Sequence, residues 1–271
     1  MRKFLFLSLI LGLCLYLLAG YKVRQDMFYF PNSQRISLVN MLQKEVLADE
    51  DYNTIYEQTG INKILIRQLE QQPDFETQIL RLQNNYYKHY YVQKTAMSIF
   101  TSWDKVLDRK GNWTPVFELA PYENGDIFVT KSTYTANWRH GHAGIVVDEV
   151  HGKVLESLEP NTKSILQNAS KWEYYPTFEM LRATKLPKET RNEIANYALT
   201  NLQGVPYNIL AHKWQGKSPT STHCSLIVWQ AFMAFGINLD GNGGIWVSPQ
   251  DFAKSPHLEV MQIFGINPKK L

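Results

Sequence analysis

Cys224 and His142 are the residues whose types and surroundings are suited to nucleophilic chemistry. Cys224 begins a segment whose residue spacing predicts a helix, carried by Leu226, Ile227, Gln230 and Ala231. At a helix N-terminus the free N–H groups and the helix dipole favour a thiolate, with a pKa below the free value of about 8.5. The other cysteine, Cys14, lies in an N-terminal apolar stretch, so no disulfide is expected between the two. The alternative is that Cys224 is a buried, inert cysteine.

His142 supplies a candidate base. It lies in residues 141–147, a glycine-bounded, β-branched run of strand length, and a second such run, residues 153–158, follows across a turn. The two runs predict a hairpin. A three-residue loop puts Glu156 opposite Gly144 and diagonal to His142 on one face, whereas a four-residue loop puts it on the other face. With the three-residue loop, Cys224 as nucleophile, His142 as base and Glu156 as orienting carboxylate form the set that thiol acyl transfer requires.

Four motifs follow one another along the chain. They are Gly125-Asp126-Ile127, Gly141-His142-Ala143-Gly144-Ile145-Val146, Gly204-Val205-Pro206-Tyr207-Asn208 and His223-Cys224-Ser225-Leu226-Ile227-Val228-Trp229. In that order they resemble the permuted papain-like hydrolases of the YiiX/YaeF type, which are relatives of the NlpC-type cell-wall amidases. The resemblance covers residues 116–264, and the histidine precedes the cysteine, as the permuted order requires. It implies Cys224 as nucleophile, His142 as general base, Glu156 as the third polar residue and Tyr207 near the site. His223 departs from the aromatic residue usual at that position.

The remaining histidines raise the alternative of a metal site. His140 and His142 form a His-x-His pair that would share one face of a strand, as in some metal centres. Further ligands would have to come from a turn, a hairpin and a helix start, and the chain has no His-Glu-x-x-His or paired-cysteine spacing. We therefore expect no metal and no cofactor. His140 is expected at the rim of the site, and His223 is a candidate supporting residue.

The N-terminus predicts a membrane segment. Residues 4–21 are uncharged and rich in Leu, Ile and Phe, and they follow the basic start Met1-Arg2-Lys3. Residues 1–24 are thus expected to form a signal-anchor, because Leu17 and Leu18 make both candidate cleavage sites poor. The basic start predicts that the rest lies outside the cytoplasm, periplasmic or at the cell surface. Cleavage of the segment would make the protein secreted.

The rest of the chain predicts an α+β protein in two parts. Residues 25–112 are expected to form a helical lobe, since helical spacing recurs to about residue 106 between the breaks at Gly60 and Pro73. Residues 113–271 are expected to form the catalytic domain, an antiparallel sheet with the cysteine helix packed across it. A formal net charge of +3 is too small to argue for a nucleic-acid partner.

Together these features predict a cysteine peptidase or amidase that works through a thioester. The expected substrates are peptide or amino-acyl amides, with cell-wall peptides as the leading class, and the backbone N–H of Cys224 is the expected oxyanion donor. One alternative is a lipid-directed thiol acyltransferase or acyl hydrolase, although the Asn-Cys-Glu-His-Phe signature of such acyltransferases is absent from the sequence. A second alternative is a non-catalytic peptide-binding module, which would not need a thiolate.

Overall fold

The computed structural model describes residues 6–7, 10–18, 28–99, 101–135, 138–215 and 219–270. Its α-helices beyond residue 28 are α2 (Val39–Leu42), α3 (Asp49–Thr59), α4 (Lys63–Leu69), α5 (Phe75–Tyr86), α6 (Lys188–Tyr197), α7 (Cys224–Met233) and α8 (Pro249–Ala253). Other helical segments are the 3₁₀ turns η1 (Ala169–Tyr174), η3 (Lys213–Gln215) and η4 (Pro268–Lys270) and the π-helical segment η2 (Ala198–Leu202). Its strands are β1 (Tyr91–Ala96), β2 (Thr101–Leu107), β3 (Ile127–Thr130), β4 (Thr133–Thr135), β5 (Trp138–Arg139), β6 (His142–Asp148), β7 (Lys153–Glu156), β8 (Ile165–Asn168), β9 (Phe178–Arg182) and β10 (Glu259–Phe264).

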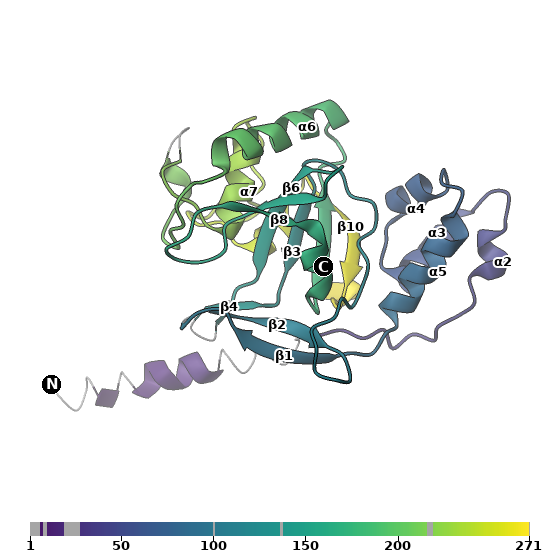
Figure 1. The fold of residues 1–271 in the computed structure, drawn as a ribbon, viewed down its shortest axis with the longest axis horizontal. Helices are drawn as coiled ribbons and strands as arrows, with labels where there is room; N and C mark the ends of the chain where they lie inside the picture. Colours follow the sequence, from purple (N-terminus) through teal and green to yellow (C-terminus); the bar gives the residue numbers. More distant parts are fainter. Residues whose placement is uncertain are drawn as a thin grey trace.

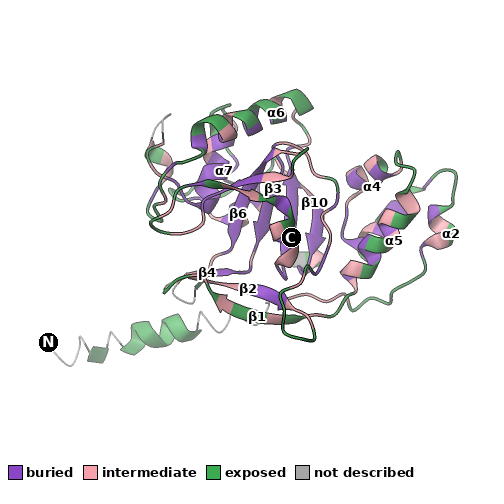
Figure 2. Cartoon of the chain, in the orientation of Figure 1, coloured by how far each residue is buried: buried purple, intermediate pink, exposed green. Residues whose placement is uncertain are grey.

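The strands form two antiparallel sheets, which confirms the α+β class. The larger sheet has the order β10-β9-β3-β6-β7-β8, and the smaller has the order β1-β2-β4-β5. Figure 1 shows α6 and α7 on one side of the larger sheet, with α2 to α5 beside β10. In Figure 2 the strands of the larger sheet are mostly buried, whereas β1 is mostly exposed.

Both faces of the larger sheet are apolar, because side chains alternate between them along each strand. On β3, Ile127 and Val129 belong to the buried cluster that contains Leu226 and Ile227 of α7. Phe128, between them, belongs to the other cluster, which includes the buried side chains of the helical lobe. The sheet therefore lies between the cysteine helix and a second core that continues into the lobe.

The helical lobe is tied to the edge strand β10 through the backbone. Gly60 ends α3 in the left-handed conformation with a φ of 75°, and its carbonyl accepts a hydrogen bond of 2.8 Å from the N–H of Ile263. The N–H of Asn62 donates to the carbonyl of Met261 over 2.9 Å. These bonds cover an edge that would otherwise expose unpaired backbone groups.

The helical prediction for residues 87–106 is wrong. Helix α5 ends at Tyr86, and β1 then pairs with β2 from Tyr91↔Leu107 to Ala96↔Ser102. This hairpin continues into β4 of the smaller sheet. Pairing with a later strand decides the structure here, and such a non-local contact leaves no periodic signal within the segment.

The prediction of a membrane helix is also corrected. Within the described ranges, no helix combines the length and the apolar character needed to cross a membrane. Residues 10–18 of the expected segment are helical. The rest of the expected segment, residues 1–5, 8–9 and 19–24, lies outside the described residues. The membrane anchor, and the location that depended on it, are therefore not supported.

Candidate active site

The β6–β7 hairpin places His142 and Glu156 on one face of the larger sheet. Gly144 pairs with Glu156, in the register that the sequence predicted. Nearer the turn, a bulge puts Asp148 opposite Lys153 in place of the expected three-residue loop, and this change lies beyond the site. The Nε2 atom of His142 lies 2.7 Å from Oε2 of Glu156, so the two side chains are hydrogen-bonded.

The glycines around His142 make this contact sterically feasible. A Cβ atom on Gly144 would lie 2.7 Å from Val154 Cγ1 and 3.0 Å from Glu156 Cγ, so a larger residue would displace the glutamate. Gly141 has a φ of 82°, and a Cβ there would lie 2.6 Å from the carbonyl oxygen of Thr130. The glycines on either side of His142 therefore have a steric cause.

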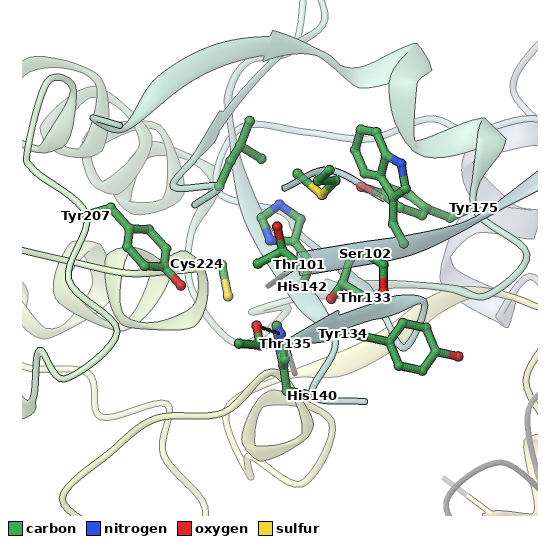
Figure 3. A pocket seen from close by; sticks show the side chains of 13 residues that line it. Thr101, Ser102, Thr133, Tyr134, Thr135, His140, His142, Tyr175, Tyr207 and Cys224 are labelled. Atoms are coloured by element: carbon green, nitrogen blue, oxygen red, sulfur yellow. Dashed lines mark hydrogen bonds between the residues drawn. The ribbon is translucent and has the colours of Figure 1, made fainter. Parts of the chain in front are cut away.

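Cys224 is the first residue of α7 and is buried beside His142. The preceding residue, His223, is the N-cap, and its Nδ1 accepts a hydrogen bond of 3.4 Å from the N–H of Leu226. The Cys224 thiol has side-chain hydrogen bonds to both His142 and His223. Because Nε2 of His142 contacts Glu156, Nδ1 is the ring nitrogen left for the thiol. Figure 3 shows Cys224 and His142 lining the same pocket.

The charges of this pair are strongly perturbed. Burial raises the pKa of the Cys224 thiol, but hydrogen bonds from His142 and His223 outweigh burial and hold that pKa well below its usual value. Burial lowers the pKa of His142, but contacts with Cys224 and Glu156 outweigh it and raise the pKa to about 9. A lowered thiol pKa beside a raised imidazole pKa favours the thiolate–imidazolium pair, the form in which a cysteine is nucleophilic.

Glu156 has two further partners that the sequence did not reveal. Its carboxylate accepts a hydrogen bond of 3.0 Å from Nζ of Lys171 and one of 3.1 Å from Nε1 of Trp172. Burial raises the pKa of Glu156, but the positive charges of Lys171 and His142 lower it to about 2. The Trp172 ring also stacks on the His142 ring, with centroids 5.4 Å apart and planes 13° apart. Both residues belong to η1, so they fix the base and the carboxylate together.

The other predicted residues lie around the thiol. Two hollows, described below, meet at Cys224, and Tyr207 lines both of them. Burial raises the pKa of the Tyr207 phenol. His140 lines both hollows as well, and its Nε2 lies 2.8 Å from Oγ1 of Thr135. His223 caps α7 and contacts the thiol. All six candidate residues are therefore brought to one place.

Two hollows meet at Cys224. The inner chamber is narrow, with a cavity volume of about 20 Å³. It lies beside the smaller sheet and is lined by Met97, Thr101, Ser102, Trp103, Thr133, Tyr134, Thr135, His140, His142, Leu158, Tyr175, Tyr207 and Cys224. The outer groove, with a volume of about 370 Å³, is lined by Thr135, Trp138, His140, Tyr207, Ile209, His223, Cys224, Ser225, Trp246, Val247, Ser248 and Pro249. A substrate lying across Cys224 can thus extend to both sides of the thiol.

The described residues do not form a metal centre. Across the parts of the chain that the structure describes, no group of three or more His, Cys, Asp or Glu side chains is arranged to hold an ion. His140 and His142, the pair considered above, each have Nε2 engaged, with Thr135 and Glu156 respectively.

The fold and the site together define an α+β protein with an assembled cysteine–histidine–glutamate group. No protein-family model matches the chain. The chain is similar to the uncharacterized protein YycO of Bacillus subtilis (strain 168), with 29% identity over 149 residues, and the match spans 52% of this chain and 56% of YycO. Among solved structures, it is similar to the metalloprotein yiiX from Escherichia coli O157:H7, with a TM-score of 0.41, 17% identity, and coverage of 52% of this chain and 96% of yiiX.

Neither similarity is extensive enough to assign the chain to a family. The match covers little more than half of YycO, and the TM-score to yiiX is too low to carry an argument about the site. What can be concluded about the chemistry therefore comes from the residues of this chain.

Proposed function

We propose that this chain is a thiol-dependent amide hydrolase with a permuted papain-like catalytic domain, in which Cys224 is the nucleophile. The observation that supports the proposal most is the continuous contact from Cys224 through His142 to Glu156. Each member has the role that its position allows: the thiol lies at a helix N-terminus, the imidazole lies between thiol and carboxylate, and the carboxylate is held by a lysine. A residue set of this kind is the one required for acyl transfer by a thiol.

The proposed reaction begins from the thiolate–imidazolium pair. The Cys224 sulfur attacks the carbonyl carbon of the amide, a C–S bond forms, and the carbonyl oxygen takes the negative charge. His142 gives its proton to the leaving nitrogen as the C–N bond breaks, which releases the amine and leaves a thioester. A water molecule, deprotonated by His142, then attacks the thioester, and the acid is released as the thiolate re-forms.

The oxyanion would be stabilised at the start of α7. Cys224 is the first helical residue, where an N–H group has no acceptor within the helix, and the positive end of the helix dipole faces the same space. We propose the backbone N–H of Cys224 as the main donor to the developing oxyanion. The favoured substrates are peptide or amino-acyl amides, with cell-wall peptides as the leading class.

The outer groove favours a second candidate, a lipid-directed thiol acyltransferase or acyl hydrolase. Trp138, Ile209 and Trp246 line this groove with 45%, 48% and 55% of their surfaces exposed. Exposed apolar side chains gathered in one groove are typical of binding surfaces for apolar groups. The same nucleophile would then attack an ester or amide of an acyl chain.

Selective alkylation of Cys224 tests the shared chemistry of both candidates. Iodoacetamide should label Cys224 rapidly well below pH 8.5, the pKa of a free thiol, and Cys14→Ala serves as the background for a single thiol. Cys224→Ala and Cys224→Ser should abolish turnover and leave thermal unfolding nearly unchanged. Turnover of peptide amides with none of acyl esters selects the first candidate, and the reverse selects the second. Slow labelling and no turnover of either would reject both and leave a binding module.

A further inference from the structure

The inner chamber contains buried polar atoms that have no hydrogen-bond partner. They are the hydroxyl of Tyr175, the indole Nε1 of Trp103 and Oγ1 of Thr133. Tyr175 is 0% exposed and Thr133 is 7% exposed, and all three residues line the chamber together with Cys224 and His142. In the view of Figure 3, Tyr175 lies on one side of His142 and Cys224 on the other. Unpartnered polar groups are rare in protein interiors, so three in one chamber require an explanation.

These atoms are suited to contact an oxygen acceptor. The indole N–H can only donate a hydrogen bond, and the two hydroxyls can donate while they also accept. Neither hydroxyl is used to fix the catalytic residues, since His142 and Glu156 take their partners from η1 and α7. A ligand oxygen in the chamber would accept hydrogen bonds from those of the three groups that reach it.

The charge at the Trp103 end of the chamber favours an anion. The ammonium of Lys105 lies 4.0 Å from the Trp103 ring centroid and 4.4 Å from the Tyr175 ring centroid. In the part of the chain that the structure describes, Lys105 has no carboxylate partner within ion-pair distance, whereas neighbouring Lys171 is paired with Glu156. Burial lowers the pKa of Lys105 to about 8, so the ammonium is still mostly charged at neutral pH.

A second group of charges lies beside Tyr134, another residue of the chamber wall, and includes the ammonium of Lys94, which lies 4.2 Å from the Tyr134 ring centroid. The hydroxyl of Tyr134 donates to Oδ2 of Asp104 over 2.8 Å, and the positive charge of Arg139 acts on the same carboxylate. Lys105 is the cation that lies behind the rings of the two residues with unpartnered donors, Trp103 and Tyr175.

We propose that the inner chamber is a subsite for a carboxylate that the substrate carries close to its scissile amide bond. This assignment depends on the proposed function, because it takes Cys224 as the reacting atom. The carboxylate accepts hydrogen bonds from Trp103 and Tyr175, and the ammonium of Lys105 compensates its charge through the ring faces. The outer groove then receives the apolar part of the substrate on the other side of the thiol.

The test compares alkylating reagents that differ by one charge. N-iodoacetylglycine and N-iodoacetylglycinamide have the same length, but only the first carries a carboxylate; N-iodoacetyl-β-alanine and its amide extend the same comparison by one carbon. The rate constant for Cys224 is measured with each reagent in Cys14→Ala. For each pair, the rate constant of the carboxylate reagent is divided by that of the amide reagent. The same ratio is measured with N-acetylcysteine amide, a free thiol, and the ratio for Cys224 divided by the ratio for this free thiol is called the quotient. For at least one length we expect the quotient to exceed tenfold, about the effect of a hydrogen bond to a charged group.

Matched variants separate the subsite from the general attraction of the imidazolium. Tyr175→Phe and Trp103→Phe remove a donor and keep a ring, and each should reduce the quotient by about threefold or more. Tyr174→Phe and Trp113→Phe remove the same groups from neighbouring residues that do not line the chamber, and they should leave the quotient unchanged. Because the Tyr175 hydroxyl has no partner in the fold, Tyr175→Phe should unfold at a temperature no lower than the parent. Trp103→Phe also loses ring contacts with Lys105 and Tyr175, so it should unfold at a lower temperature.

The outcomes distinguish this proposal from the proposed function. Rapid labelling by both members of a pair, with a quotient that Tyr175→Phe and Trp103→Phe leave unchanged, overturns the carboxylate subsite and keeps the activated thiol. Such a result would mean that the chamber holds only water or a neutral group. Labelling by every reagent at the rate of a free thiol overturns the activated cysteine itself.

Discussion

Replacing Glu156 by glutamine tests whether the carboxylate orients His142 through its charge. The carboxylate accepts hydrogen bonds from His142, Lys171 and Trp172. The amide oxygen of glutamine can accept from the first two if it takes the position of Oε2. The amide NH₂ then faces the indole N–H of Trp172, donor against donor. The variant therefore keeps the shape of the site, loses its negative charge and leaves one buried donor without an acceptor.

The structure bounds the size of the effect. Burial lowers the pKa of His142, and contacts with Cys224 and Glu156 raise it to about 9 from 6.5. If Glu156 supplies half of the net rise, its charge accounts for about one pKa unit, or roughly 1.4 kcal/mol. We expect turnover to fall about tenfold. The unpaired Trp172 donor should in addition destabilise the fold by about 1–3 kcal/mol.

The pH profile is the decisive measurement. Since His142 must be protonated to release the amine, activity is lost as pH rises through its pKa. This loss of activity forms the basic limb of the pH profile, and in Glu156→Gln the limb should move to lower pH by about one unit. Asp148→Asn is the matched control, because Asp148 bonds to His151 and not to His142, and its profile should equal that of the parent. A basic limb that stays in place, or a defect as large as that of His142→Ala, would refute the orienting role.

Three further predictions concern the same network. His142→Ala should lower turnover at least about 100-fold, the usual effect of losing a general base, while His140→Ala should do much less; steady-state kinetics that rank them in reverse would contradict the assignment. Gly144→Ala should reduce turnover because its Cβ would lie 3.0 Å from Glu156 Cγ, and an unchanged rate would argue against that close contact. The pKa of Glu156 is lowered from 4.5 to about 2, so its stabilising effect should be complete above pH 4.5 and lost as pH falls toward 2. Thermal unfolding of the parent should show this loss, and Glu156→Gln should show less of it.

The hairpin shows how much of the site the sequence could predict. Alternation along β6 and β7 allows only two faces, and Glu156 was correctly placed opposite Gly144. The loop assumed for that placement was wrong, because Asp148 pairs with Lys153 and leaves four loop residues; the bulge between Val146 and Asp148 restores the predicted face. The start of α7 was equally accessible, because helical spacing begins at Cys224. Local spacing therefore predicts the helix start and the strand faces, but it does not predict the bulge.

Lys171 and Trp172 could not be predicted in this way. They lie on η1, a short 3₁₀ turn after β8, and nothing in the spacing of that turn points to a residue on β7. Their contacts depend on how the turn packs against the sheet, which is a tertiary property. The strands β1 and β2 were missed for a related reason, since each is defined by pairing with another segment.

Lys171 explains why Glu156 can remain charged although it is wholly buried. An isolated carboxylate in an apolar interior takes up a proton. Without Lys171, the single positive charge of His142 would have to balance the negative charges of both the Glu156 carboxylate and the Cys224 thiolate. With Lys171 bonded to Glu156, the network holds two positive and two negative groups, so each carboxylate or thiolate has a cation beside it. The ionised state of the nucleophile thus depends on a lysine that does not touch it, and Lys171→Met should raise the pKa at which Cys224 is alkylated. An unchanged alkylation profile in Lys171→Met would show that His142 alone keeps the thiol ionised.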